Sequence, residues 1–123
     1  MPYLHSKTFD IIEADMRDDP EYFAVDDLLA LAIQVLNRKG YYTWVCCEGH
    51  PFETERYLDI AFHDSVDLPY LPDGFCFEHC RLQYFYKTDG SVFDFEREKA
   101  DVCEVLTAWA ESLPDNPLRK DTI

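Results

Sequence analysis

The chain is poor in glycine, in basic residues and in long apolar runs, and each shortage excludes a class of protein. Its four glycines, at positions 40, 49, 74 and 90, never approach the spacing of a phosphate-binding loop. No apolar run approaches the roughly 18 residues that a membrane helix needs, and the N-terminus lacks the basic and then apolar layout of a signal peptide. The sequence therefore predicts a soluble, cytoplasmic protein with no membrane partner.

The shortage of basic residues leaves 25 acidic against 11 basic side chains and a net charge of −14. This field repels phosphate backbones, so nucleic acid is not an expected partner. A well-solvated acidic surface is the interpretation we favour, and the alternative is carboxylates that mimic nucleic acid in a basic groove of another protein. Aromatic residues make up 15% of the chain, which is typical of a folded domain and not of a disordered segment.

Disulfides cannot form the framework of the fold, because five cysteines is an odd count and no secretory signal is present. Reduced thiols are expected, and at least one of them is free or a ligand. A chain of 123 residues can bury one core without cross-links. We therefore expect a single domain over residues 1–123 that ends in a polar tail at 114–123.

The residues between Gly40 and Pro51 form the segment around which the other elements are arranged. Residues 41–47 are rich in Thr, Val and aromatic side chains, which favour a strand, and the following loop carries Glu48 and His50. Before them, acidic residues, an apolar stripe and a closing glycine predict a helix over residues 26–39. Simple alternation would place Trp44 and Cys46 on one side of the strand and Cys47 on the other.

The remaining elements follow from periodicity and turn residues. Strands are expected over residues 8–14, 57–63, 75–87 and 91–93, and a second amphipathic helix is expected from Asp94 to the proline at position 114. The order β-α-β-β-β-α predicts an α+β fold. Its architecture would be a two-layer sandwich, in which two long helices cover one face of a mainly antiparallel sheet of four or five strands.

Chemistry would centre on Cys47 and His50, which could form a nucleophilic thiol and imidazole pair oriented by Glu48, Glu53 or Asp59. Acidic neighbours raise the pKa of a thiol, which weakens this hypothesis. The alternative is that the cysteine packs and the histidine hydrogen-bonds in a loop.

A zinc site is the second chemical hypothesis, since soft ligands occur in two groups. The candidate ligands are Cys47, His50, Cys76, His79 and Cys80. An extended strand would place residues 76 and 80 about 13 Å apart, and residues 75–80 contain no glycine to form a turn. We therefore expect no cofactor unless zinc is present, and buried cysteines that act as small hydrophobes are the alternative.

Aromatic residues are concentrated in the predicted strands, and helices on one face would leave several rings on the other. Such a surface, with carboxylates around it, is typical of a face that binds another protein or a second copy of the chain. The candidate binding residues are Trp44, Glu48, Arg56, Tyr57, Asp59 and His63.

Two stretches of the sequence resemble known families. The motif G-Y-x-T-x-x-C-C-x-G-H at residues 40–50 and the L-P-x-G-F turn at 71–75 resemble a set of small bacterial and prophage proteins of unknown activity. That likeness covers residues 28–87; it supports the element order and implies no function. The cysteine at 47 and glycine at 49 after a β run also resemble the tRNA wybutosine-synthesis methyltransferase family, over too few positions to assign catalytic residues.

The sequence thus favours a non-catalytic module, with a phage origin as one option, that binds a protein or associates with itself as a homo-oligomer. The alternative is a small enzyme or zinc protein that uses Cys47 and His50.

Overall fold

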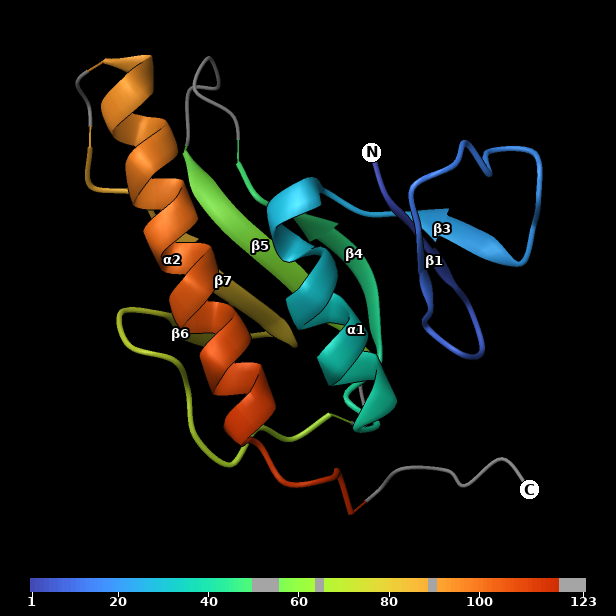
Figure 1. Cartoon of the computed structure of the whole chain (residues 1–123). Coiled ribbons are helices and arrows are strands. Elements are labelled where there is room, and N and C mark those ends of the chain that lie inside the picture. The colour runs from blue at the N-terminus through green and yellow to red at the C-terminus, as the bar shows by residue number, and fades with distance from the viewer. Residues whose placement is uncertain (50–55, 64–65, 89–90, 118–123) are drawn as a thin grey trace.

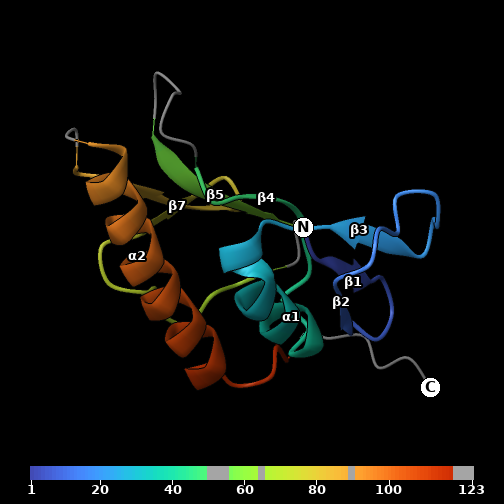
Figure 2. The same cartoon turned by 45° about the horizontal axis from the view of Figure 1, so that its top comes forward.

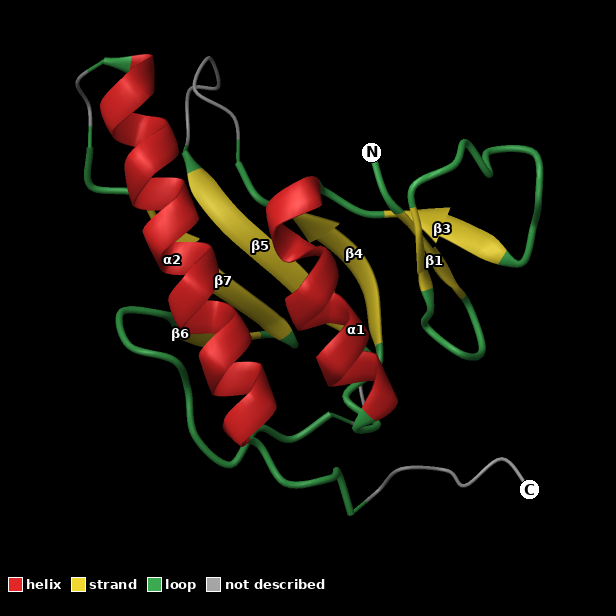
Figure 3. Cartoon of the chain, viewed as in Figure 1, coloured by secondary structure: helices red, strands yellow, loops and turns green. Residues whose placement is uncertain are grey.

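The computed structural model describes residues 1–49, 56–63, 66–88 and 91–117, without the side chain of residue 45. It contains two antiparallel sheets and two α-helices (Figure 3). In chain order the elements are β1 (Tyr3–His5), β2 (Ile11–Ile12), β3 (Tyr22–Ala24), the 3₁₀ helix η1 (Asp27–Leu29), α1 (Ala30–Arg38), β4 (Thr43–Cys47), β5 (Tyr57–Phe62), β6 (Cys76–Glu78), β7 (Arg81–Phe85) and α2 (Val92–Ser112).

The larger sheet has four strands in the order β4-β5-β7-β6, and every neighbouring pair is antiparallel. Both helices lie across the same face of this sheet, as Figures 1 and 2 show from two directions. The predicted α+β class and the predicted antiparallel sheet with helices on one face are confirmed. The first helix is shorter than predicted, because its first turn is the 3₁₀ helix η1 and α1 has nine residues.

The core lies between this sheet and the helices, and strand alternation determines which side chains enter it. On β5, Leu58, Ile60 and Phe62 point to the helices and are at most 2% exposed. They meet the apolar stripe of α1, in which Ile33 and Leu36 are fully buried. Each such side chain contributes roughly 1.5–3 kcal/mol by leaving water. Among the described residues, neither helix has the length and apolarity to cross a membrane.

The N-terminal residues form a separate three-stranded sheet, in the order β2-β1-β3, beside α1 and β4. The prediction of a single strand over residues 8–14 is wrong, because strands of two or three residues are too short to show a period. Side chains of α1 hold this sheet: Gln34 Nε2 donates to the Phe9 carbonyl at 3.0 Å, and Arg38 Nε donates to the Thr8 carbonyl at 3.1 Å. Arg38 also pairs with Asp10 at 2.8 Å.

The predicted strand over residues 75–87 is in fact a hairpin. His79 and Cys80 have φ values of 52° and 61°, and they join β6 to β7 as a two-residue turn. Glycine is the residue expected at such a turn, because left-handed conformations are costly for other residues. In this turn, His79 and Cys80 adopt that conformation in place of glycine.

The second helix begins earlier than predicted, so the expected strand over residues 91–93 is wrong. The Ser91 hydroxyl caps the helix by accepting a hydrogen bond from the Asp94 backbone N–H at 3.2 Å. At the other end, Lys39 Nζ donates to the Leu113 carbonyl at 2.6 Å. The Asn116 N–H donates to the Lys39 carbonyl at 2.8 Å, so the first residues of the predicted polar tail are fixed against the end of α1.

Candidate functional site

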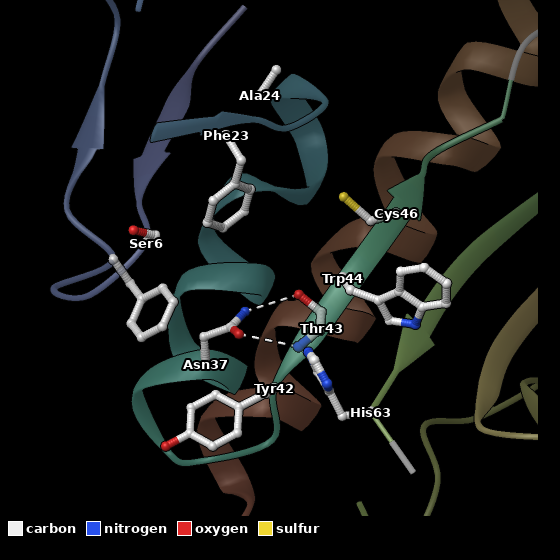
Figure 4. Close-up of a pocket in the computed structure, with 10 residues that line it drawn as sticks. Ser6, Phe23, Ala24, Asn37, Tyr42, Thr43, Trp44, Cys46 and His63 are labelled. Carbon is white, nitrogen blue, oxygen red and sulfur yellow. Dashed lines mark hydrogen bonds between the residues drawn. The ribbon is translucent and has the colours of Figure 1, made fainter. Parts of the chain in front are cut away.

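A β-bulge in β4 changes which side chains share a face of the large sheet. Thr43 pairs with Phe62 and the residue at 45 pairs with Ala61, so Trp44 has no partner in β5. Cys46 then packs toward the core. The ring of Trp44 lies on the opposite side of β4 from Cys46, and Trp44 is 69% exposed (Figure 4). The predicted alternation, which put Trp44 and Cys46 together, is therefore wrong, because a bulge inserts one residue into the period.

The face of the large sheet that the helices leave uncovered carries the predicted binding residues Trp44, Tyr57 and Asp59. We call this surface the outer face and define it by Trp44, Cys47, Tyr57, Asp59, Ala61, Cys76, Glu78, Arg81, Gln83 and Phe85. Phe85 is 53% exposed, and its ring centroid lies 5.4 Å from that of Tyr57. The outer face thus presents aromatic rings at both ends of β5.

An ion pair occupies the middle of the outer face. Two nitrogens of the Arg81 guanidinium on β7 bind the Asp59 carboxylate on β5. Nε lies 3.2 Å from Oδ1, and the second nitrogen contacts Oδ2. The Asp59 side chain is only 8% exposed, whereas that of Arg81 is 46% exposed. Hydrogen bonding to Asp59 raises the pKa of Arg81. Asp59 is therefore satisfied within the chain, and Arg81 is the charged group that this face offers to a partner.

Glu48, a predicted binding residue, is held inside the molecule just after β4. Its Oε1 lies 3.1 Å from Nζ of Lys99, a lysine of α2 that is 5% exposed. The Leu28 backbone N–H donates to Oε2, and the Glu48 N–H donates to a carboxylate oxygen of Asp26 at 2.8 Å. The Tyr86 hydroxyl donates to the Glu48 carbonyl at 2.6 Å. These contacts fix the backbone at the point where it leaves the sheet.

The Lys99 ammonium is kept charged by its partners. Burial lowers the pKa of Lys99, but hydrogen bonds to Glu96 and Glu48 outweigh burial, so the pKa is raised. A raised pKa favours the charged form of Lys99, which is paired with two carboxylates. The arrangement serves to anchor the chain.

The described thiols near this anchor are unsuited to nucleophilic chemistry. Burial raises the pKa of Cys46 and of Cys103 to about 12 each. Such thiols stay protonated at neutral pH, and the thiolate is the reactive form. Cys47 is half-buried at the end of β4, and its predicted partner His50 lies outside the described residues.

The zinc candidates are spread over the sheet. The strand register places Cys47, Asp59, Gln83 and Cys76 in one row across all four strands. Three strand spacings separate Cys47 from Cys76 by about 14 Å, so these two thiols cannot share an ion. His79 and Cys80 form the turn beyond β6, and the described part of the chain holds no group of three or more potential ligands.

Two other predicted binding residues have separate surroundings. The guanidinium carbon of Arg56 lies 5.3 Å from the ring centroid of Phe95, and its NH1 donates to the Thr88 carbonyl at 3.3 Å. Arg56 is therefore part of the packing against α2. His63 is exposed just after β5, and its backbone N–H donates to the Tyr42 carbonyl.

A groove of about 490 Å³ separates the three-stranded sheet from the edge of β4. Figure 4 shows Phe23 on one side and Thr43 with Cys46 on the other, above Asn37 of α1. Asn37 is buried and satisfied: its Nδ2 donates to the Thr43 hydroxyl at 3.0 Å, and its Oδ1 accepts from the Thr43 N–H at 3.1 Å. The lining residues are Ser6, Phe9, Phe23, Ala24, Asn37, Tyr42, Thr43, Trp44, Cys46 and His63.

The structure thus places Trp44, Tyr57 and Asp59 together on the outer face, Trp44 and His63 at the groove, and Glu48 and Arg56 in internal contacts. Comparison with protein-family models, curated protein sequences and solved structures found no match.

Sequence reasoning missed several residues that shape these surfaces. Lys99 could have been found, since it interrupts the apolar stripe of α2 between Phe95 and Val102, where a buried cation needs a carboxylate partner. Phe85 could have been found from the alternation of β7. Phe9 and Phe23 had no signal, because they lie in or beside strands too short to show a period.

Proposed function

We propose that this protein is a non-catalytic binding module that engages another protein through the outer face of its four-stranded sheet. The observation that carries this proposal is the exposure of Trp44. The bulge turns a large ring out of the pairing pattern and onto a face where it is 69% exposed. A tryptophan in this position leaves most of its surface in water in the isolated chain, whereas tryptophan is enriched at the energetic centres of protein interfaces.

The composition of the outer face supports the same function. Aromatic residues and arginine are enriched in protein interfaces, and acidic residues and lysine are depleted there. The outer face carries Trp44, Tyr57, Phe85 and Arg81. Its charged groups are one cation and two carboxylates, and one of the carboxylates, that of Asp59, is already paired. A partner can therefore cover this face without leaving many charges unpaired.

The rest of the described surface differs in charge. Exposed positions of α2 include Asp94, Asp101, Glu104 and Glu111, with Arg97 as a counter-charge. Carboxylates at this density keep a helix solvated and disfavour its burial. The outer face is thus the part of the large sheet and its helices that can lose water at the lowest cost.

The test compares proteins recovered from cells that express the tagged chain with those recovered by two variants. Trp44→Ala combined with Phe85→Ala should reduce recovery of the bound protein at least about tenfold, a loss of about 1.4 kcal/mol in binding free energy. Phe93→Ala is the matched control, because Phe93 is 67% exposed but lies at the start of α2, outside the outer face. Quantitative mass spectrometry measures recovery.

Self-association is measured on the same three proteins by sedimentation velocity. A dimer that the double variant dissociates would identify a second copy of the chain as the partner. Equal recovery of every protein by wild type and double variant, with a monomer throughout, would disprove the proposal.

A further inference from the structure

We propose that the groove between the three-stranded sheet and β4 binds a short, extended, basic peptide segment of another protein, which pairs with β4 at Cys46. This site adjoins the outer face and shares Trp44 with it, but its other lining residues lie outside that face, and it does not depend on the function proposed above. Three observations carry it: the backbone groups of β4, the conformation of Phe9 and the charge of the surrounding residues.

The first observation concerns the free edge of β4. The Phe62 N–H donates to the Cys80 carbonyl at 2.8 Å, so residues 58, 60 and 62 of β5 direct their backbone groups toward β7, and residues 59 and 61 direct theirs toward β4. The register then directs the groups of Thr43, Cys46 and Glu48 away from β5. Two of these three N–H groups are occupied: that of Thr43 by Asn37, and that of Glu48 by Asp26. The N–H and C=O of Cys46 lie between these two occupied N–H groups, on the edge of β4 that borders the groove.

This pattern limits what can bind. An unprotected edge strand would pair with any extended chain, and side chains that occupy its ends are a known protection against this. Between Thr43 and Glu48 the backbone spans about 17 Å, which leaves space to pair about three residues of a partner. The geometry therefore suits a short segment that donates to and accepts from Cys46, with side chains alternating to either side.

The second observation is the backbone of Phe9, which lines the groove with a φ of 59°. A bulky residue rarely adopts this left-handed conformation, and such strain persists where surrounding contacts impose it, often at binding sites. The turn between β1 and β2 holds it, since the Phe9 N–H donates to the His5 carbonyl at 2.9 Å and the His5 N–H donates to the Asp10 carbonyl at 3.0 Å. Gln34 of α1 also donates to the Phe9 carbonyl. With Phe23 opposite β4, the groove offers rings to an apolar side chain of the segment.

The third observation gives the charge of the partner. Residues 10–27, which form most of the three-stranded sheet and its loops, contain eight carboxylates and one cation, Arg17. Arg17 is already paired with Asp15 at 2.5 Å. The described residues that line the groove include no carboxylate, but the sheet on one side of it carries a net negative charge, which attracts cationic segments and repels acidic ones. The segment should thus combine an apolar anchor with flanking lysine or arginine.

The experiment selects binders from a library of random 12-residue peptides displayed on phage, with the full chain immobilised. A selected peptide is then synthesised with a fluorescent label, and its affinity is measured by fluorescence polarisation. Ala24→Trp fills the groove, because Ala24 is exposed and lines it. Ala108→Trp is the matched control on the exposed side of α2, and Phe85→Ala tests independence from the outer face.

We expect the selected peptides to share an apolar residue between lysines or arginines. Ala24→Trp should weaken binding at least about tenfold, while Ala108→Trp and Phe85→Ala should change it less than about twofold. Raising NaCl from about 50 to about 500 mM should weaken binding, since salt screens the negative charge of residues 10–27. Hydrogen exchange followed by NMR should show slower exchange of the Cys46 amide in the complex.

Several results would overturn the inference. They are the absence of any enriched peptide family, enrichment of acidic peptides, binding that Ala24→Trp leaves unchanged, and binding without protection of the Cys46 amide. Loss of binding in Phe85→Ala alone would place the peptide on the outer face, which would refute the groove site and leave the proposed function standing.

Discussion

At the scale of single residues, the most consequential group is the ammonium of Lys99, buried between Glu48 and Glu96. It joins α2 to the segment that follows β4, and it also contacts the Gly49 carbonyl at 3.4 Å. Gly49 itself has no room for a side chain, because a Cβ there would lie 2.9 Å from Tyr86 Cε2. Charge pairing and close packing thus position the same stretch of backbone.

Replacing Lys99 with methionine should destabilise the protein by about 3–5 kcal/mol, since Glu48 would remain buried without its cation. Glu96→Gln should cost less than about 1 kcal/mol, because the Glu96 side chain is 45% exposed and water replaces the lost contact. Urea denaturation followed by circular dichroism measures both values. Similar losses for the two variants would show that the Lys99 and Glu48 pair is not the strong contact.

At the scale of elements, the turn between β6 and β7 holds two residues in a backbone conformation that costs conformational free energy. Two residues with side chains, His79 and Cys80, adopt left-handed conformations that glycine accepts without penalty. Register across this hairpin is set by the pairing of Glu78 with Arg81. The turn therefore follows from the pairing of the strands and not from local sequence preference.

Cys80→Gly should stabilise the protein by about 1 kcal/mol, because it removes left-handed strain at the turn. Cys76→Gly, the same substitution within extended β6, should destabilise it by about 0.5–1 kcal/mol through the greater freedom of the unfolded chain. Thermal unfolding of both variants provides the comparison. A loss of stability in Cys80→Gly would mean that the thiol makes a contact worth more than the strain.

The elements also show what a sequence can and cannot predict. β5 was predicted almost to the residue, because Leu58, Ile60 and Phe62 alternate cleanly, and α1 was predicted from its stripe and closing glycine. The hairpin turn and the three-stranded sheet were not predicted. The strands of the small sheet and β6 have only two or three residues, so a local period cannot reveal them, and their pairing with other segments determines where they form.

For the candidate site, composition predicted that rings would remain on the uncovered face, and Trp44 and Tyr57 do lie there. The internal roles of Glu48 and Arg56 could not be foreseen, because both depend on residues of α2 that are distant along the chain, Lys99 and Phe95 respectively. The pairing of Cys47 with His50 stays a prediction.

At the scale of the whole molecule, the charge of −14 is distributed unevenly. It is concentrated on residues 10–27 and on the exposed side of α2, while the outer face is close to neutral. Like charges at these densities repel one another in the compact state. The fold therefore carries an electrostatic penalty that depends on the solvent.

Raising NaCl from about 10 to about 300 mM at pH 7 should raise the melting temperature by several degrees, which for a domain of this size corresponds to about 1 kcal/mol. The increase should shrink near pH 4.4, the isoelectric point expected from the sequence, where few net charges remain to be screened. Differential scanning calorimetry measures both series. A melting temperature that falls with salt at pH 7 would show that ion pairs such as Asp59 with Arg81 outweigh the repulsion.

The bulge in β4 has one more consequence. Because Trp44 has no partner in β5, deleting it would join Thr43 directly to the residue that pairs with Ala61, and the ladder would become regular without changing any other pair. The fold could thus be encoded by a chain one residue shorter. Trp44 is thus an insertion that the pairing of β4 with β5 does not require.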